Sequence, residues 1–198
     1  MGLILASKSP RRRELLSLLG IDFKVVSEDI DETIRPDVPV TEEIKRLSYE
    51  KALAVVNSID TDDIIIAADT VVVINNRIFG KPENEADAVS MLKALSGKTH
   101  SVITGITVMS NDKSDTRAVV TEVNFRNLSD TEISAYVKTG DPLDKAGAYA
   151  IQGISTIFIT GISGDHFNVY GLPLCTLADM LRSFGVTILG EYTEGKNA

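Results

Sequence analysis

The run Ile64-Ile-Ile-Ala-Ala-Asp-Thr-Val-Val-Val-Ile74 is the segment of this 198-residue chain most typical of a β-strand. Its β-branched and apolar residues predict a strand buried in the core. Asp69 interrupts the run, and a carboxylate is costly to bury without a partner. The partner could be a set of backbone N–H groups, an arginine or a metal, or Asp69 could open to a cleft. We favour a functional site, because acids are rare in apolar strands unless they are paired.

The first residues predict a strand, a tight turn and a helix. Leu3 to Ala6 is a short apolar run, Pro10 suits the first turn of a helix, and Gly20 suits its end. Backbone N–H groups at a helix start favour anions, and Arg11–Arg13 bring three permanent cations to the same turn. The alternative is a basic turn paired with the chain's own acids, but cations there oppose the helix dipole. We expect an anion site, with phosphate as the leading ligand.

The composition narrows the classes of partner. The formal net charge is −8 at pH 7, which argues against nonspecific binding to nucleic acid, because that binding needs a basic surface. A small polyanion remains compatible, since a local cationic pocket and a metal can override the net charge. Cys175 is the only cysteine, so an intramolecular disulfide is excluded, and we expect this residue in the core.

The hydropathy pattern predicts no membrane partner. No apolar run reaches the length of a membrane span, and the first residues lack a charged leader followed by a long apolar core. We therefore expect a cytoplasmic protein. The polar tail after Leu189 is expected to be loosely held.

An acidic loop and a second helix are predicted after the first helix. Residues 27–39 form the expected loop, and a helix should run from about Thr41 to Asn57, with Thr41 as its cap and Lys51 along it. Neighbouring acids repel each other unless solvent or a cation separates them, and for a lone acidic loop solvation is the usual state. The acids of this loop are Glu28, Asp29, Asp31 and Glu32.

The middle of the chain contains several turn and capping motifs. Asn75-Asn76 predicts a tight turn, and Gly80-Lys-Pro82 follows it. The glycine and proline make this loop stiff, so Lys81 is presented at a fixed place, although an ordinary surface lysine is the alternative. Asn84 is expected to cap a helix, and Ser129-Asp-Thr-Glu132 is a capping box before another.

Small residues dominate a stretch of the second half. Residues 141–153 lack a clear period, and we expect them to form a wall against a ligand, with Lys145 and Gln152 as the polar side chains. Residues 156–162 and 167–170 are expected to be the strands of a hairpin.

These signals point to one chemistry. An anion site at the first helix, a carboxylate in a buried strand, acids in a loop and lysines on stiff segments could together hold a triphosphate and a divalent metal. Carboxylates bind Mg²⁺ or Mn²⁺ through oxygen, while arginine and lysine neutralise phosphate charge. A water activated by a carboxylate or by the metal could then attack phosphorus.

Five motifs, in order and spacing, closely resemble the Maf family. The resemblance implies hydrolysis of a nucleoside triphosphate to the monophosphate and pyrophosphate with a divalent metal, as in the members that act on dTTP and UTP. It implies one α/β domain over residues 1–198, with two lobes, a long central mixed β-sheet flanked by helices as in the inosine triphosphatases, and an active-site cleft between the lobes. The motifs are Ala6-Ser-Lys-Ser-Pro-Arg-Arg12, Ala68-Asp-Thr-Val71, Gly80-Lys-Pro82, Asp144-Lys-Ala-Gly-Ala-Tyr149 with Ile151-Gln-Gly153, and Gly171-Leu-Pro173.

The same resemblance assigns roles to single residues. Asp69 matches the proton acceptor, and Glu32 matches an acid of the following loop that would hold the metal together with Asp69. The phosphate-binding residues it implies are Ser7, Arg12, Lys51 and Lys81. Those linked to the choice of base are Arg11, Thr70 and Gln152, and the Asp-Thr pair fits the dTTP/UTP type rather than relatives that act on methylated GTP.

Two other functions compete with this one. The family name refers to septum formation, so the chain could bind a nucleotide and regulate cell division, with hydrolysis only incidental. A general phosphatase would release orthophosphate instead of pyrophosphate. The resemblance also implies a homodimer, a role in cleaning the nucleotide pool of dTTP, UTP or modified pyrimidine nucleotides, and a link to arrest of cell division.

Overall fold

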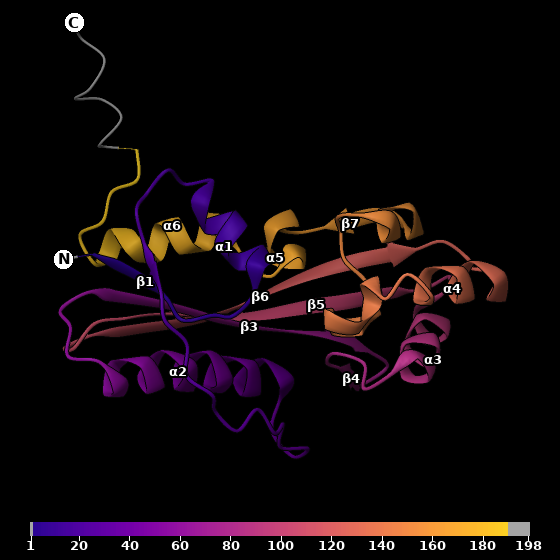
Figure 1. Cartoon of the computed structure of the whole chain (residues 1–198), viewed down its shortest axis with the longest axis horizontal. Coiled ribbons are helices and arrows are strands. Elements are labelled where there is room, and N and C mark those ends of the chain that lie inside the picture. Colours follow the sequence, from indigo (N-terminus) through magenta and orange to yellow (C-terminus); the bar gives the residue numbers. More distant parts are fainter. Residues whose placement is uncertain (1, 190–198) are drawn as a thin grey trace, which may run out of the picture. The chain divides into compact units, whose positions relative to one another are not determined.

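The computed structural model describes residues 2–189 and contains one mixed β-sheet (Figure 1). Its strands are β1 (Leu3–Leu5), β2 (Lys24–Val25), β3 (Ile64–Ile74), β4 (Arg77–Phe79), β5 (Thr99–Met109), β6 (Ser114–Phe125) and β7 (Ile159–Ser163). The strand order is β2-β1-β3-β5-β6-β7, with β4 paired to β3. β1 runs parallel to β2 and β3, whereas β4 and β7 run antiparallel to β3 and β6.

Helices cover the sheet and connect its strands. The α-helices are α1 (Pro10–Ser17), α2 (Val40–Ser58), α3 (Glu85–Leu95), α4 (Asp130–Val137), α5 (His166–Tyr170) and α6 (Leu174–Ser183). Three short 3₁₀ segments follow α4, namely η1 (Asp141–Asp144), η2 (Ala146–Ala148) and η3 (Ile154–Phe158). Within the part of the chain described, none of these helices combines the length and apolarity that a bilayer span needs.

The described residues divide into two compact units. The first comprises residues 2–69, 105–118 and 171–189, and the second comprises 70–104 and 119–170. The strands β3, β5 and β6 contribute residues to both units.

In the first unit, α2 lies on one face of the sheet, and α1 and α6 lie on the other (Figure 1). Ala52 and Val55 of α2 pack with apolar residues of β1 and β3, which forms a buried core. Gly105 of β5 permits a very close approach of the helix, because a Cβ atom there would lie 2.2 Å from the carbonyl oxygen of Ile44. One turn further along α2, the Ser48 hydroxyl hydrogen-bonds Thr107 at 2.9 Å.

The second unit has a separate core rich in aromatic side chains. Phe125 packs edge to face against His100, at 4.9 Å between centroids, and against Tyr149, at 4.7 Å. The Nε2 atom of His100 lies 2.7 Å from the Tyr149 hydroxyl, while its Nδ1 atom is buried with no protein partner among the described residues. His100 therefore lies in surroundings that disfavour a charged imidazole.

Local signals in the sequence correctly predicted several elements. Asn75 and Asn76 have φ values of 49° and 62°, the left-handed pair that a tight β3–β4 turn requires. The side chain of Asn84 accepts from the Asp87 N–H at the start of α3, and Ser129 with Glu132 forms the capping box of α4. These short-range patterns succeed because each satisfies backbone groups within a few residues.

Two predictions about single residues are wrong. The helix α2 begins at Val40, one residue before the expected cap, so Thr41 lies within its first turn and does not cap it. Cys175 is exposed, because the buried face of α6 is formed by Leu174, Leu177, Met180 and Leu181. The helical period, rather than the apolar run around Cys175, decides which side chains face the core.

In the second unit, one prediction is wrong and another needs a partial correction. The expected hairpin does not form, because β7 pairs with β6 and residues 166–170 form α5, where Asp165 accepts from the N–H groups of Phe167 and Asn168. The expected ligand wall is partly core, since Ala148 and Tyr149 are buried. Lys145 is buried and bonds both Asp141 and Asp144. The tail after Leu189 lies outside the described residues.

We predict that His100 makes the stability of the protein depend on pH. Burial lowers the pKa of His100 from 6.5 to about 4. The unfolded chain therefore binds a proton between these values that the folded chain does not. The free energy of unfolding should fall as the pH drops through this window, by up to about 3 kcal/mol. Urea titrations of His100→Gln should give a flatter pH profile, because glutamine does not titrate.

His166→Gln is the matched control, since His166 is the other histidine and is exposed. Its profile should follow the wild type. Parallel profiles for wild type and His100→Gln would contradict the assignment to His100.

Candidate active site

Lys51 joins two carboxylates in the first unit. Its Nζ atom lies 2.7 Å from Glu32 Oε1 and also donates a hydrogen bond to Asp69 Oδ1. Lys51 and Asp69 are largely buried, with 15% and 14% of their side chains exposed, whereas Glu32 is 62% exposed. Asp69 therefore has the charged partner that its place in an apolar strand requires.

The local structure explains how this contact forms. Residues 64–68 of β3 are fully buried, and the strand becomes half-buried at Asp69. On α2, Lys51 precedes the buried Ala52 and so lies at the margin of the face that packs on the sheet. Its long stem can follow the apolar surface while its ammonium reaches Asp69.

Arg12 forms the second cationic part of the site. Its Nε atom donates to the carbonyl oxygen of Gly171 at 2.8 Å, and its Nη1 atom donates to Ser7 Oγ at 3.3 Å. Burial lowers the pKa of Arg12, and the negative charge of Asp69 acts in the opposite direction. Because an arginine pKa starts far above neutrality, Arg12 stays a cation.

Ser7 lies in the turn between β1 and α1 and is buried. Its Oγ atom accepts from the Ser9 N–H at 3.2 Å and from Arg12, so it organises the turn from within. Ser9 is the N-cap residue of α1, and its side chain makes no capping hydrogen bond. The turn thus combines the positive end of a helix with a fixed guanidinium, as an anion site requires.

The acids of the loop have different partners. Asp29 pairs with Lys8 at 2.6 Å, and Asp31 accepts from the Thr33 N–H at 2.9 Å. Only Glu32, among these three, contacts Lys51. Its selection as the site acid agrees with this contact, although its role remains a prediction.

The structure brings Ser7, Arg12, Glu32, Lys51 and Asp69 into one group within the first unit. Arg11 is half-buried on α1 of the same unit.

The other three predicted residues belong to the second unit. Lys81 is exposed between β4 and α3, and Gln152 is exposed after η2. Thr70 hydrogen-bonds Thr104 at 2.9 Å, and the Thr104 hydroxyl donates to the carbonyl oxygen of Asn168 at 3.2 Å.

The carboxylates fit a hard divalent cation by their chemistry. Within residues 2–189, no three acidic, histidine or cysteine side chains form a ready-made metal site. However, Glu32 and Asp69 direct one oxygen each at the same ammonium, so both lie within reach of one cation. Mg²⁺ is commonly held by one or two carboxylates, with the remaining ligands from phosphate and water. The pair suits such an ion.

Sequence reasoning missed a charged cluster beside Glu32. Glu43 of α2 is completely buried, and Arg35 and Arg46 both donate to its carboxylate. The i,i+3 spacing of Glu43 and Arg46 on a predicted helix was the available signal. It gave no sign that Glu43 would be buried and bonded to a loop residue.

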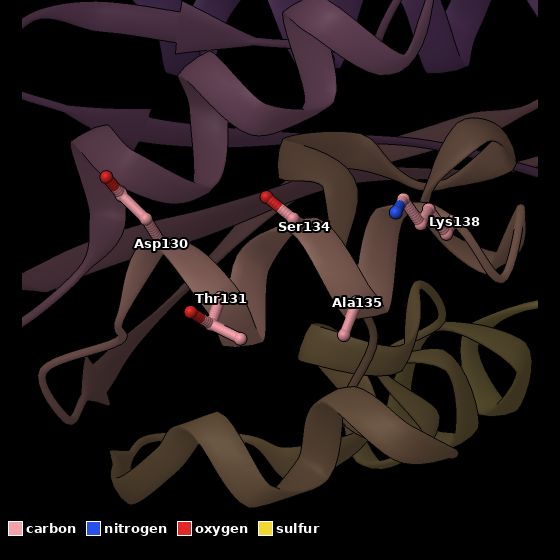
Figure 2. A pocket seen from close by; sticks show the side chains of 5 residues that line it. All are labelled: Asp130, Thr131, Ser134, Ala135 and Lys138. Atoms are coloured by element: carbon pink, nitrogen blue, oxygen red, sulfur yellow. The ribbon is translucent and has the colours of Figure 1, made fainter.

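A shallow pocket in the second unit does not form a comparable site (Figure 2). Its lining residues all belong to the stretch Asp130–Lys138, along α4 and its C-terminal end. Among the residues that the structure describes, no second element contributes a converging polar group to its lining, which a specific ligand site usually needs. The lining residues are Asp130, Thr131, Ser134, Ala135 and Lys138.

Comparison with known proteins decides the family. Residues 2–184 match the family described as Maf-like protein. This chain belongs to the Maf family. Two relatives of this Maf chain are named dTTP/UTP pyrophosphatase. The protein of Alkaliphilus oremlandii is 50% identical, and the match covers 94% of this chain and 98% of the relative. That of Desulforamulus reducens is 47% identical, with the same two coverages.

The fold is also that of a more distant solved structure. The Ham1 protein of Staphylococcus aureus superposes with a TM-score of 0.52 at 13% identity, covering 92% of this chain and 99% of that one. The predicted α/β fold, with a mixed central sheet flanked by helices, is confirmed by this likeness and by the strand order.

We predict that Arg12 also stabilises the folded Maf chain. Arg12→Gln removes a charged donor from the buried carbonyl of Gly171. The free energy of unfolding should fall by about 1–3 kcal/mol in urea titrations followed by circular dichroism. Arg13→Gln, in the same turn but exposed, should change it by less than about 0.5 kcal/mol. Equal losses in both variants would contradict this role.

Proposed function

We propose that this Maf chain hydrolyses dTTP and UTP to the nucleoside monophosphate and pyrophosphate. Two relatives with this name are 50% and 47% identical over 94% of the chain. The observation that carries the mechanism is the contact of Lys51 with Asp69 and Glu32, together with the guanidinium of Arg12, whose pKa burial lowers and the charge of Asp69 raises. Cations and carboxylates in one group suit a polyphosphate that arrives with a divalent ion.

The cations bind the phosphate chain. Arg12 is held by Gly171 and Ser7, so its guanidinium is oriented before a ligand arrives. Little side-chain entropy is then lost on binding. Lys51 adds a second positive charge, and we assign Lys81 of the second unit to the same role because it lies in the Gly80-Lys-Pro82 motif.

Glu32 and Asp69 would hold the divalent metal, Mg²⁺ or Mn²⁺. When bound, such an ion neutralises phosphate charge and stabilises the charge that develops in the transition state. The exposed position of Glu32 leaves it accessible to an ion that enters with the nucleotide.

Asp69 acts as the proton acceptor. A water oxygen forms the new bond to the α-phosphorus, the bond from that phosphorus to the bridging oxygen breaks, and pyrophosphate leaves with the electron pair. The proton of the water passes to the Asp69 carboxylate. Lys51 orients this carboxylate through its hydrogen bond.

Specificity for the base is assigned to Arg11, Thr70 and Gln152. Thr70 is held by Thr104, so its hydroxyl has a fixed direction, while Gln152 is exposed and available to a ligand. Modified pyrimidine nucleotides would be further substrates. Because nucleoside triphosphates are made in the cytoplasm, we place the reaction there, as cleaning of the nucleotide pool.

We predict that Asp69→Asn lowers the turnover of dTTP by at least about 100-fold with saturating Mg²⁺, because the amide cannot accept the proton. Pyrophosphate release is the measurement. Asp63→Asn is the matched control, since Asp63 directly precedes β3 and also pairs with a lysine, Lys24. Near-normal turnover by Asp69→Asn would reject the role of Asp69.

We also predict which phosphorus is attacked. Hydrolysis of dTTP in ¹⁸O-labelled water should place the label in dTMP and leave pyrophosphate unlabelled, as mass spectrometry would show. Label in orthophosphate would indicate a general phosphatase. Binding of UTP without any turnover would instead support a nucleotide-binding regulator of cell division.

A further inference from the structure

A buried carboxylate on α2 holds two arginines next to the proposed metal site. Glu43 has none of its surface exposed, and its Oε1 atom accepts from Arg35 Nε at 2.7 Å. Its Oε2 atom accepts from Arg46 Nη2 at 2.9 Å. A buried charge of this kind is stable only while it is paired, so Glu43 holds the donors of these two arginines in place around it.

Arg35 connects Glu43 to the acidic loop. It is part of the loop and follows Glu32 by three residues. Its backbone N–H donates to Glu43 Oε2 at 3.0 Å, in addition to the contacts of its guanidinium. Main chain and side chain of one loop residue are thus fixed by the same carboxylate.

Arg46 holds the loop at a second point. Its Nη2 atom donates to the carbonyl oxygen of Thr33 at 2.8 Å, as well as to Glu43. Its Nη1 atom donates to Glu50 at 2.8 Å, which fixes the direction of the guanidinium. Thr33 directly follows Glu32, so this contact acts on the residue next to the proposed metal ligand.

The helix α2 therefore holds both the backbone that follows Glu32 and the carboxylate of Glu32 itself. Glu43 and Arg46 fix the chain after it, and Lys51, further along α2, receives its carboxylate. The hydrogen bonds from Arg35, and then those from Arg46, lower the pKa of Glu43 to about 2. The cluster consequently keeps its charges throughout the neutral range.

We propose that Glu43 and Arg46 are positioning residues that fix the loop at Thr33 and Arg35 and so place the Glu32 carboxylate beside Lys51. This inference deepens the proposed function and rests on it for its effect on turnover. The loop carries no apolar anchor at Glu32 itself, which is 62% exposed. Without the two contacts, Glu32 would have its pairing with Lys51 and the local turn in which Asp31 accepts from the Thr33 N–H, but no described hydrogen bond from α2 to the loop backbone next to it.

The test compares three variants with the wild type. Arg46→Lys keeps the charge but cannot bond Thr33, Glu43 and Glu50 together. Arg35→Met removes the guanidinium contacts from the loop side, while the backbone N–H of residue 35 and Arg46 still pair the buried Glu43, so the variant should fold. Arg117→Lys is the matched control, because Arg117 also joins two carboxylates of the first unit, Asp115 and Asp179, without touching the loop.

Hydrogen exchange of the backbone amides gives a readout that needs no activity. The Arg35 amide in the wild type and in Arg117→Lys should exchange slowly. In Arg46→Lys it should exchange about tenfold faster, with the melting temperature close to that of the control. Arg35→Met should give faster exchange of the amides of residues 31–35.

Kinetics with dTTP gives the second readout. In Arg46→Lys and Arg35→Met, kcat should fall about 10- to 100-fold and the Mg²⁺ concentration for half-activation should rise, while the KM for dTTP changes little. Arg117→Lys should behave as the wild type.

Unchanged exchange and unchanged kcat in both loop variants would overturn the proposal. So would equal losses in the control, or losses that only follow a lower melting temperature. If the wild type releases no pyrophosphate, the proposed function fails, and the exchange of the amides of residues 31–35 alone decides whether Glu43 and Arg46 hold the loop.

Discussion

The contact between Asp69 and Lys51 constrains how α2 packs on the sheet in the first unit. Five consecutive apolar residues of β3 are excluded from solvent, and the next residue is an acid. A carboxylate at that point must be paired, so a cation has to arrive from a neighbouring element. α2 supplies it, and the helix must therefore lie close to the sheet and in one rotational setting. The positions of the loop and of Glu32 follow from that setting.

The residues around Asp69 include two cations, although the chain as a whole is acidic. The protein carries a net charge of −8, yet the half-buried Lys51 bonds Asp69 and the half-buried Arg12 is under the influence of its negative charge. Oxygen atoms of Gly171 and Ser7 hold the guanidinium without neutralising it. The positive charges of Arg12 and Lys51 are thus balanced by the carboxylates of Glu32 and Asp69. A group balanced in this way can accommodate small changes in the charge of a ligand. Such a balance suits a polyanion that binds together with a metal ion.

Structural features that depend on residues close in sequence were predicted correctly. The strand with Asp69, the Asn75-Asn76 turn, the Asn84 cap and the capping box of α4 were all predicted correctly, because each depends on neighbours in sequence. The family was identified from motif order, and the matched residues 2–184 bear it out. Five of the proposed site residues form one group, while the assignment of chemical roles remains a prediction.

What failed depends on contacts between distant residues. β7 pairs with β6 rather than forming a hairpin with the next segment. The pairing of Lys145 with Asp141 and Asp144 was not foreseen either. The Glu43 cluster was missed because the partner Arg35 lies in a loop with no period, and nothing in its neighbours indicates which helix it will meet. Burial of charge is decided by tertiary packing, which local patterns do not encode.

The close packing of β5 against α2 limits which residues can replace Gly105. Even a methyl group there would collide with the main chain of α2 at Ile44. The helix would have to retreat from the sheet, and the ammonium of Lys51 would retreat with it. A position that touches no ligand and has no functional group of its own therefore governs the spacing of the charges. Sequence variation at 105 should be as restricted as at the acids and bases themselves.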